Sequence, residues 1–326
     1  MRLRYHFAMA APQPLSLAEI QAARSAIAGS AIRTPLVRLN VLDSPAEIHL
    51  KLENLQPIGS FKIRGATNAM ARAPREQLQR GVLTASAGNM AQGVAWSARR
   101  LGVACTVIAP DTAVETKVQA IERLGARVIK VPFDRWWQTF HERSYPGVEG
   151  LFIHAFDDRD VMAGNGTIGL EILEDLPDVD AILIPWGGGG LTCGIASAVR
   201  ALKPSVKLLA AEVATAAPLA PSLAAGSPQT VAYEPSFVDG IGSKTIFPQM
   251  FALARTLIDG AVVAALEEVA SALRLLVERN RIVAEGAGAC PVACALAGKA
   301  GTGKIACVVS GGNIDAARLC ALLNAR

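Results

Sequence analysis

The stretch AILIPWGGGGLTCGIASAVRAL, residues 181–202, joins an apolar run to an alanine-rich run through four consecutive glycines. The first run is typical of a buried strand, and the second has the composition of a helix. Glycines between a strand and a helix let the backbone wrap closely around an anion such as a phosphate. Residues 181–199 carry no charge, but the proline and glycines among them would break a membrane-spanning helix. We therefore expect a strand, a phosphate-binding loop and a helix.

The same alternation of strand and helix continues on both sides of this stretch. Runs rich in β-branched residues predict further strands at residues 48–53, 81–85, 104–109, 127–131, 207–212, 262–266 and 305–310. Apolar residues at helical spacing predict helices at residues 17–28, 60–71, 89–101, 112–124, 266–279 and 291–300, and from residue 315. Such alternation predicts an α/β fold with open, twisted, mainly parallel sheets, whose ligands bind beyond the carboxyl ends of the strands.

The composition excludes several classes of protein. The chain has 326 residues, enough for about two domains, and its 51% hydrophobic content excludes a disordered chain. The 32 basic and 28 acidic residues leave a net charge of +4 without basic blocks, so we expect no nucleic-acid partner. Six cysteines without a CxxC pair indicate reduced thiols and no zinc site. We expect a soluble cytoplasmic protein without a membrane segment or a signal peptide.

The segment GSFKIRGA, residues 59–66, places a lysine directly after a predicted turn. Ser60 is expected to cap a helix, so that Lys62 lies in the first helical turn. The partial positive charge of a helix N-terminus lowers the pKa of a nearby lysine, whose neutral amine can then attack an aldehyde. An ordinary solvated lysine is the alternative interpretation.

Two further loops follow predicted strands. The segment SAGNMAQG, residues 86–93, opens a helix, and its backbone amides could bind a carboxylate. The segment SGGNID, residues 310–315, brings the hydroxyl of Ser310 to the carboxyl end of a buried strand. Each of these segments could also be a structural turn without a ligand.

In chain order, the four loops lie at residues 59–66, 86–93, 187–190 and 310–315. Together they resemble those of pyridoxal-phosphate enzymes of fold type II, in particular the threonine/serine dehydratase and serine racemase group. The resemblance extends from about residue 35 to residue 315. It implies a two-lobed fold like that of the tryptophan synthase β subunit, and a homodimer. Residues 1–81 and 158–326 would form a large cofactor-binding domain, and residues 82–157 a small mobile domain.

The resemblance also implies roles for individual residues. Lys62 matches the catalytic lysine that binds pyridoxal 5′-phosphate covalently. The other residues that match the cofactor site are Asn89, Gly187, Gly188, Gly189, Gly190, Leu191 and Ser310. The residues that match the substrate site are Ser86, Ala87, Gly88, Met90 and Phe156. A neutral serine beside the pyridine nitrogen favours elimination over transamination.

The implied reaction is elimination of water from a 3-hydroxy amino acid of the serine or threonine type, which yields a 2-oxo acid and ammonia. Trp136 and Trp137 leave open a bulkier substrate such as phenylserine, although packing of a helix is the simpler interpretation. The chain could instead catalyse β-replacement, as cysteine synthases do, or bind the cofactor without catalysing a reaction.

Four positions depart from or extend the family pattern. Ala87 stands where racemases carry a serine base, and Met90 stands where a histidine is usual. Glu212 matches one ligand of a family cation site, but Pro218 replaces the aspartate, so we expect no metal. Glu285 resembles a family glutamate near the cofactor, without an assigned role.

Overall fold

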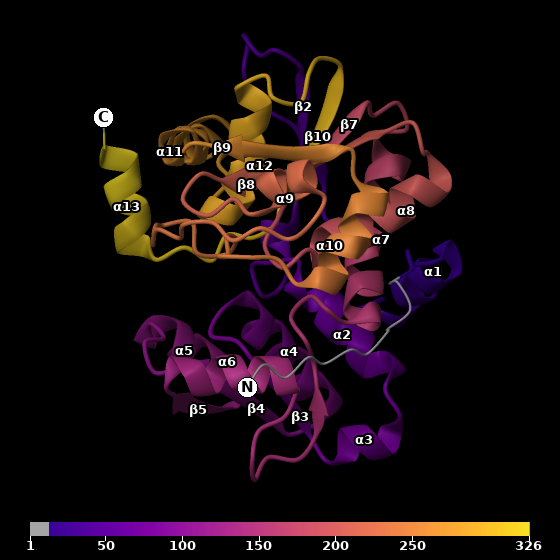
Figure 1. Ribbon diagram of the computed structural model, residues 1–326, viewed down its shortest axis with the longest axis vertical. Coiled ribbons are helices and arrows are strands. Elements are labelled where there is room, and N and C mark those ends of the chain that lie inside the picture. The colour runs from indigo at the N-terminus through magenta and orange to yellow at the C-terminus, as the bar shows by residue number, and fades with distance from the viewer. Residues whose placement is uncertain (1–12, 326) are drawn as a thin grey trace.

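The computed structural model describes residues 13–325 and contains two sheets, one above the other in Figure 1. In the larger sheet the strand order is β1-β2-β10-β7-β8-β9, and in the smaller it is β5-β4-β3-β6. Within residues 13–325, every strand pair is parallel except β1 with β2. The predicted α/β fold with mainly parallel sheets is confirmed.

Eight of the ten strands within residues 13–325 lie within about two residues of the predicted bounds, whereas the short strands β1 and β6 were not predicted. The larger sheet consists of β1 (Leu36–Arg38), β2 (Glu47–Leu52), β7 (Ala181–Pro185), β8 (Lys207–Val213), β9 (Gly260–Ala264) and β10 (Lys304–Val309). The smaller sheet consists of β3 (Val82–Ala85), β4 (Cys105–Pro110), β5 (Arg127–Val131) and β6 (Leu151–Phe152).

Helices cover both faces of the larger sheet. In β7, Ile182 and Ile184 face one core, whereas Ala181 and Leu183 face the other, because successive side chains of a strand point to opposite sides. Helices that contribute to the first core are α1 (Leu17–Ala26), α7 (Arg159–Asp175), α8 (Gly190–Leu202), α9 (Leu219–Ala225) and α10 (Pro248–Leu257). The opposite face carries α11 (Leu266–Leu275), α12 (Gly286–Leu296) and α13 (Ala316–Asn324).

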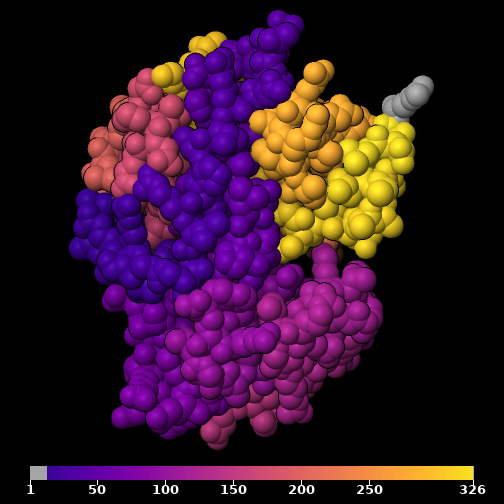
Figure 2. Space-filling view, turned by 180° about the vertical axis from the view of Figure 1, so that it is seen from behind, coloured from indigo at the N-terminus to yellow at the C-terminus, as the bar shows by residue number. Residues whose placement is uncertain are grey.

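The remaining helices lie in the middle and lower parts of Figure 1, where α2 runs between the two sheets and α4, α5 and α6 pack on the smaller one, and Figure 2 shows the same lower part from behind. They are α2 (Lys62–Arg72), α3 (Arg75–Gln79), α4 (Asn89–Leu101), α5 (Glu115–Arg123) and α6 (Phe133–Glu142). A short 3₁₀ helix (Glu53–Leu55) follows β2, and α11 ends in a π-helical turn (Leu276–Asn280). Of the helices within residues 13–325, none is long and apolar enough to cross a bilayer.

Helix α7 was not predicted, because three glycines interrupt its sequence and disfavour a helix. The structure explains them through close packing. A β-carbon on Gly164 would lie 2.4 Å from the Arg64 carbonyl oxygen, and one on Gly166 would lie 2.8 Å from that of Gly194. The glycines therefore let α2 and α8 approach the α7 backbone closely.

Two helix starts differ from the predictions. Ser60 does not cap α2: the N-cap is Phe61, and the Ser60 hydroxyl is buried without a hydrogen-bond partner among the described residues. Helix α12 begins at Gly286, and Pro291, which was expected to start it, lies inside it. Proline favours the first turn of a helix and lacks the amide that donates within the helix further along, which is why the sequence predicted a start at Pro291.

A buried ion network fixes α2 to the larger sheet and to α7. Arg64, only 1% exposed, donates to Glu53 at 2.8 Å and to Glu171 at 2.7 Å. Lys51 of β2 lies 2.6 Å from the same Glu171 carboxylate. Because these buried charges satisfy one another, the network holds the start of α2 in one place.

Candidate active site at the junction of the two sheets

The predicted loops meet where α2 and α4 pass beside the carboxyl end of the larger sheet. The Phe61 amide donates to the Ser310 carbonyl at 3.0 Å, and the Gly312 amide donates to the Gly59 carbonyl at 2.9 Å. These bonds join the lysine loop to the loop after β10. The two loops lie about 250 residues apart in the sequence, and the parallel pairing of β2 with β10 brings them together.

Lys62 is the first residue of α2, and its side chain is partly buried. Its Nζ donates to the Ala155 carbonyl at 2.7 Å. Burial lowers the pKa of Lys62 to about 8, although the nearby Glu285 carboxyl acts in the opposite direction. The lowered pKa was expected from the helix N-terminus, whereas loss of water contact is its main cause here.

The glycine loop before α8 accepts no larger residue at three positions. Gly189 has a φ of +91°, and a β-carbon on Gly188 would lie 2.0 Å from the Phe156 ring. A β-carbon on Gly190 would lie 2.7 Å from the Phe156 carbonyl oxygen. The loop precedes a helix of 13 residues, whose first amides have no partner within the helix and favour an anion.

Asn89, at the start of α4, belongs to a chain of side-chain hydrogen bonds. Its Nδ2 donates to Glu285 Oε1 at 2.8 Å, and its Oδ1 accepts from Asn313 Nδ2 at 2.8 Å. Burial raises the pKa of Glu285 to about 7, and the bond from Asn89 partly opposes this rise. The sequence pattern indicates no role for Glu285 and does not mark Asn313, since no local pattern reveals a contact across 196 residues.

A family model described as "Pyridoxal-phosphate dependent enzyme" matches residues 27–311. The chain belongs to this family. It is 46% identical over 276 residues to the L-threonine ammonia-lyase of Geobacter sulfurreducens. This alignment covers 82% of this chain and 67% of that protein. It is 40% identical to the L-threonine ammonia-lyase of Thermotoga maritima, over 95% of this chain and 78% of that protein.

Solved structures of the family have the same fold. The processed form of threonine deaminase isoform 2 from Solanum lycopersicum superposes with a TM-score of 0.83 at 32% identity, covering 95% of this chain and 94% of that one. The serine racemase of Dictyostelium discoideum superposes with a TM-score of 0.83 at 31% identity, covering 92% and 99%. The predicted resemblance to fold type II is confirmed.

The residues at the junction fit the family's cofactor, pyridoxal phosphate. The glycine loop forms a cradle that β-carbons would fill, and Lys62 offers an amine of lowered pKa. Next to these two groups in sequence, the Ser60 hydroxyl and the Trp186 indole nitrogen are buried without hydrogen-bond partners among the described residues. Buried polar atoms without a partner are rare in folded proteins and indicate a missing ligand or water.

Alanine substitutions of the cradle glycines should show which of these glycines is needed because a neighbouring side chain packs against it. We expect Gly188→Ala to destabilise the protein by about 1–3 kcal/mol and to weaken cofactor binding, because the new methyl group displaces Phe156. Gly187→Ala is the matched control for stability, since its β-carbon would lie no closer than 3.5 Å to the neighbouring atoms. Urea unfolding and titration of the cofactor absorbance measure the two effects. Equal losses in both variants would contradict the packing argument.

The pKa of Glu285 predicts a pH dependence of stability. A carboxyl whose pKa is raised from 4.5 to about 7 binds its proton more tightly in the folded state, so stability falls as the pH rises between these values. We expect Glu285→Gln to reduce this fall in the free energy of unfolding by about 3 kcal/mol. Lys62 titrates above this range.

Unfolding of the Glu285→Gln variant at a series of pH values tests this expectation. Glu234→Gln is the control, because Glu234 is an exposed glutamate whose removal should leave the slope unchanged. A slope in Glu285→Gln equal to that of the unmodified protein would show that the pKa of Glu285 is the same in the folded and unfolded states.

The predicted substrate loop follows β3. The Gly88 amide donates to the Ser86 hydroxyl at 3.2 Å, and the space beside Gly88 is open, with no described atom within 4 Å of an added β-carbon. Ala87 is partly buried and adds only a methyl group. Met90 is buried in the core under the smaller sheet, so its side chain lies away from this open space.

Phe156 belongs to a cluster of aromatic rings between α6 and α10. Its ring centroid lies 5.5 Å from that of Phe140 and 5.1 Å from that of Phe247. Trp137 packs on the same two rings, at 5.9 Å and 6.2 Å. Phe140 and Phe247 therefore separate Trp137 from Phe156, which favours helix packing over substrate recognition for the tryptophans.

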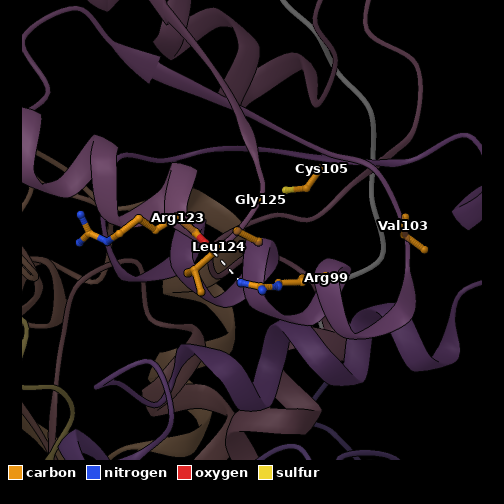
Figure 3. Close-up of a pocket in the computed structure, with 7 residues that line it drawn as sticks. Arg99, Val103, Cys105, Arg123, Leu124 and Gly125 are labelled. Carbon is orange, nitrogen blue, oxygen red and sulfur yellow. Dashed lines mark hydrogen bonds between the residues drawn. The ribbon is translucent and has the colours of Figure 1, made fainter.

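Two surface hollows of the described residues do not include the cradle glycines. One of about 380 Å³ opens beside α4 and α5, where Arg99 donates to the Arg123 carbonyl at 3.3 Å (Figure 3). Figure 3 shows the Arg123 guanidinium pointing away from the other residues. Another, of about 530 Å³, lies beside Asn54, Arg281 and Asn313. The predicted site residues, all within residues 13–325, line neither hollow.

Glu212, the candidate cation ligand, accepts hydrogen bonds from the backbone amides of Leu219 and Ala220 at 2.8 Å and 2.9 Å. Its carboxyl thus caps the start of α9. Within residues 13–325, no group of three or more His, Cys, Asp and Glu side chains is placed to hold a metal ion.

Proposed function

We propose that this protein eliminates water from a 3-hydroxy amino acid of the threonine or serine type with pyridoxal phosphate, releasing a 2-oxo acid and ammonia. The observation that carries this proposal is the Lys62 amine, partly buried, of lowered pKa, and linked through Ala155 and Phe156 to the glycine cradle. The relatives named L-threonine ammonia-lyase support threonine as the first substrate to test.

Each group at the junction has a role in this proposal. The bound cofactor would supply an aldehyde that combines with amines and a ring that withdraws electrons from the substrate α-carbon. The amides of the glycine loop and Leu191 would hold its phosphate, Asn89 its ring oxygen, and Ser310 its ring nitrogen. Since the pKa of Lys62 is about 8, a useful fraction of the amine is neutral near pH 7 and can accept the α-proton.

The substrate side of the site uses the loop after β3. The amides around Ser86 and Gly88 border the open space and would bind the substrate carboxylate. Phe156 would form a wall for the side chain, since its ring lies against Gly188. When bound, the cofactor phosphate held by the amides of the glycine loop would supply the proton with which the hydroxyl leaves as water.

An absorbance scan followed by an assay for 2-oxo acids tests this function. The substrates are L-threonine, L-serine and L-threo-phenylserine. We expect the scan to show an absorbance band of the bound cofactor and the assay to show the fastest release of 2-oxo acid from L-threonine. Sulfide-dependent formation of cysteine would instead support β-replacement. A cofactor band without turnover of any amino acid would support a binding protein.

Racemisation is the second candidate function, since solved serine racemases share the fold. It needs a second base on the other face of the substrate α-carbon, and Ala87 has no group that accepts a proton. We expect no measurable D-serine from L-serine under conditions that release pyruvate. Chiral chromatography of the products checks this, and D-serine formation would reveal a second base elsewhere.

The domain division, oligomeric state and compartment are further parts of the proposal. Residues 82–157, which include the smaller sheet, would move as a domain against residues 1–81 and 158–326. Hydrogen exchange tests this, and we expect faster exchange at the domain boundary without substrate.

Exposed Leu55 and Val283 beside the hollow of about 530 Å³ support a homodimer, which sedimentation can test. The six unpaired cysteines support a reducing compartment such as the cytoplasm.

A further inference from the structure

His154 lies in the segment that leads from β6 to α7 and is only 1% exposed. It directly precedes Ala155, whose carbonyl accepts from Lys62. The imidazole centroid lies 4.3 Å from the Phe140 ring and 4.8 Å from the Phe156 ring. These neighbours fix the orientation of the imidazole ring.

The Nδ1 atom of His154 accepts two backbone hydrogen bonds. The donors are the amides of Asp157 at 2.8 Å and Phe156 at 3.3 Å. A ring nitrogen that accepts hydrogen bonds carries no proton, so the imidazole is neutral with its proton on Nε2. Burial lowers the pKa of His154 to about 3, with further contributions from Arg143, Lys62 and His141. The imidazole therefore acts as an acceptor throughout the neutral range.

The two bonds give residues 154–157 the form of an Asx turn, in which a side-chain acceptor holds amides further along the chain. Within this turn the Ala155 carbonyl points to Lys62 Nζ at 2.7 Å. The same turn sets the Phe156 ring against Gly188. One small turn thus contacts both the lysine and the glycine cradle.

The far end of the turn is also fixed. Arg143 donates to the Asp157 carboxylate at 2.5 Å, and Gln249 donates to it at 2.9 Å. Arg143 adopts a left-handed backbone conformation with a φ of +54°, which is uncommon for arginine. These contacts fix the Asp157 carboxylate. The hydrogen bonds to His154 instead fix the backbone amides of Phe156 and Asp157, which directly follow the Ala155 carbonyl.

We propose that His154 is a positioning residue, which holds the turn so that the Ala155 carbonyl gives the Lys62 amine a fixed resting place beside the glycine cradle. The inference rests on the proposed function only in that Lys62 is the catalytic base. A displacement of a reacting group by about 1 Å can reduce a rate by about 100-fold. A turn that fixes the amine therefore acts on the reaction without touching the substrate.

Two substitutions separate the acceptor from the volume of the ring. His154→Asn keeps an acceptor, because asparagine Oδ1 and histidine Nδ1 are both bonded to Cγ. His154→Leu fills similar space but cannot accept a hydrogen bond. The first readout is the rate at which acetic anhydride acylates Lys62 in the cofactor-free protein, followed by mass spectrometry. The second readout is the kcat and KM of elimination by the holoenzyme.

We expect His154→Leu to change the Lys62 acylation rate by about 3-fold or more, and to lower kcat about 10- to 100-fold with little change in KM. His154→Asn should return the acylation rate to that of the unmodified protein and kcat to within about 3-fold of it. A purely structural role would leave the acylation of Lys62 unchanged once the variant is folded, as judged by circular dichroism.

A folded His154→Leu variant with unchanged acylation and kcat would overturn the proposal, as would a folded His154→Asn variant impaired to the same degree. Should the leucine variant not fold, His154→Gln takes its place, since its acceptor lies one bond farther from the backbone. An unmodified protein without elimination activity would disprove the proposed function instead, and the acylation rates alone would then decide the role of His154.

Discussion

Lys62→Ala is expected to lower the rate of elimination by about 1,000-fold or more while the fold is retained. Lys62 lies at the junction between the sheets, and its amine donates a hydrogen bond to the Ala155 carbonyl. Burial lowers its pKa to about 8, so its charged form contributes little to stability. Removal of the amine should therefore affect the reaction far more than the free energy of unfolding.

Assays for the 2-oxo acid and thermal unfolding together test this expectation. A matched control is Lys207→Ala, which removes an exposed lysine from β8. Added methylamine should restore part of the activity of Lys62→Ala, because a free amine can accept the α-proton in place of the side chain. Turnover at the unmodified rate in Lys62→Ala would show that another residue is the base.

Arg64→Met is expected to destabilise the protein by about 3–5 kcal/mol, the largest effect on stability that we predict. Arg64 lies two residues after Lys62 and donates to both Glu53 and Glu171 inside the protein. Although burial raises the pKa of Glu53, Arg64 lowers it below its usual value. Without Arg64, two buried carboxylates share only the charge of Lys51.

Arg72→Met on the same helix is the control. Arg72 pairs with Asp160 at 2.8 Å, but both side chains are 44% exposed, so we expect a loss below about 1 kcal/mol. Urea unfolding of the two variants provides the comparison. Losses of similar size would contradict the view that the buried network, and not arginine pairing in general, holds α2 in place.

The Arg64 network also connects stability to the reaction. It fixes the first turn of α2 against β2 and α7, and Lys62 begins that turn. We therefore infer that Lys62 and Arg64, two residues apart in the GSFKIRGA segment, have different roles. One residue supplies the amine, and the other anchors the helix that presents it.

Local sequence patterns were sufficient for much of the fold. The strands Arg127–Val131 and Ala181–Pro185 and the helix Asn89–Leu101 have the predicted bounds, because strand and helix periods and glycine turns are properties of neighbouring residues. The parallel arrangement followed from the alternation of these elements. The loops that we propose to form the active site could be singled out for the same reason, since each follows a strand.

Tertiary packing decided what local patterns could not show. Helix α7 exists because Gly164 and Gly166 allow close contact with α2 and α8, so residues that disfavour a helix alone favour it here. Ser60 does not have its expected capping role, since Phe61 is the N-cap of α2 and the Ser60 hydroxyl is buried. The dense helix packing overrides the intrinsic preference of the local sequence.

The amino-acid sequence by itself determined the family and the alternation of strands and helices, and it singled out Lys62, because these depend on residue types at short spacing. Only the tertiary structure decided the environment of that lysine. The pKa of Lys62 depends on its burial, and the Lys62 amine is oriented by the Ala155 carbonyl, which follows His154. The Asn89 side chain is held by its hydrogen bond to Glu285. These contacts join residues about 90 to 200 positions apart, and their energies depend on distance and solvent access, which exist only in the folded chain.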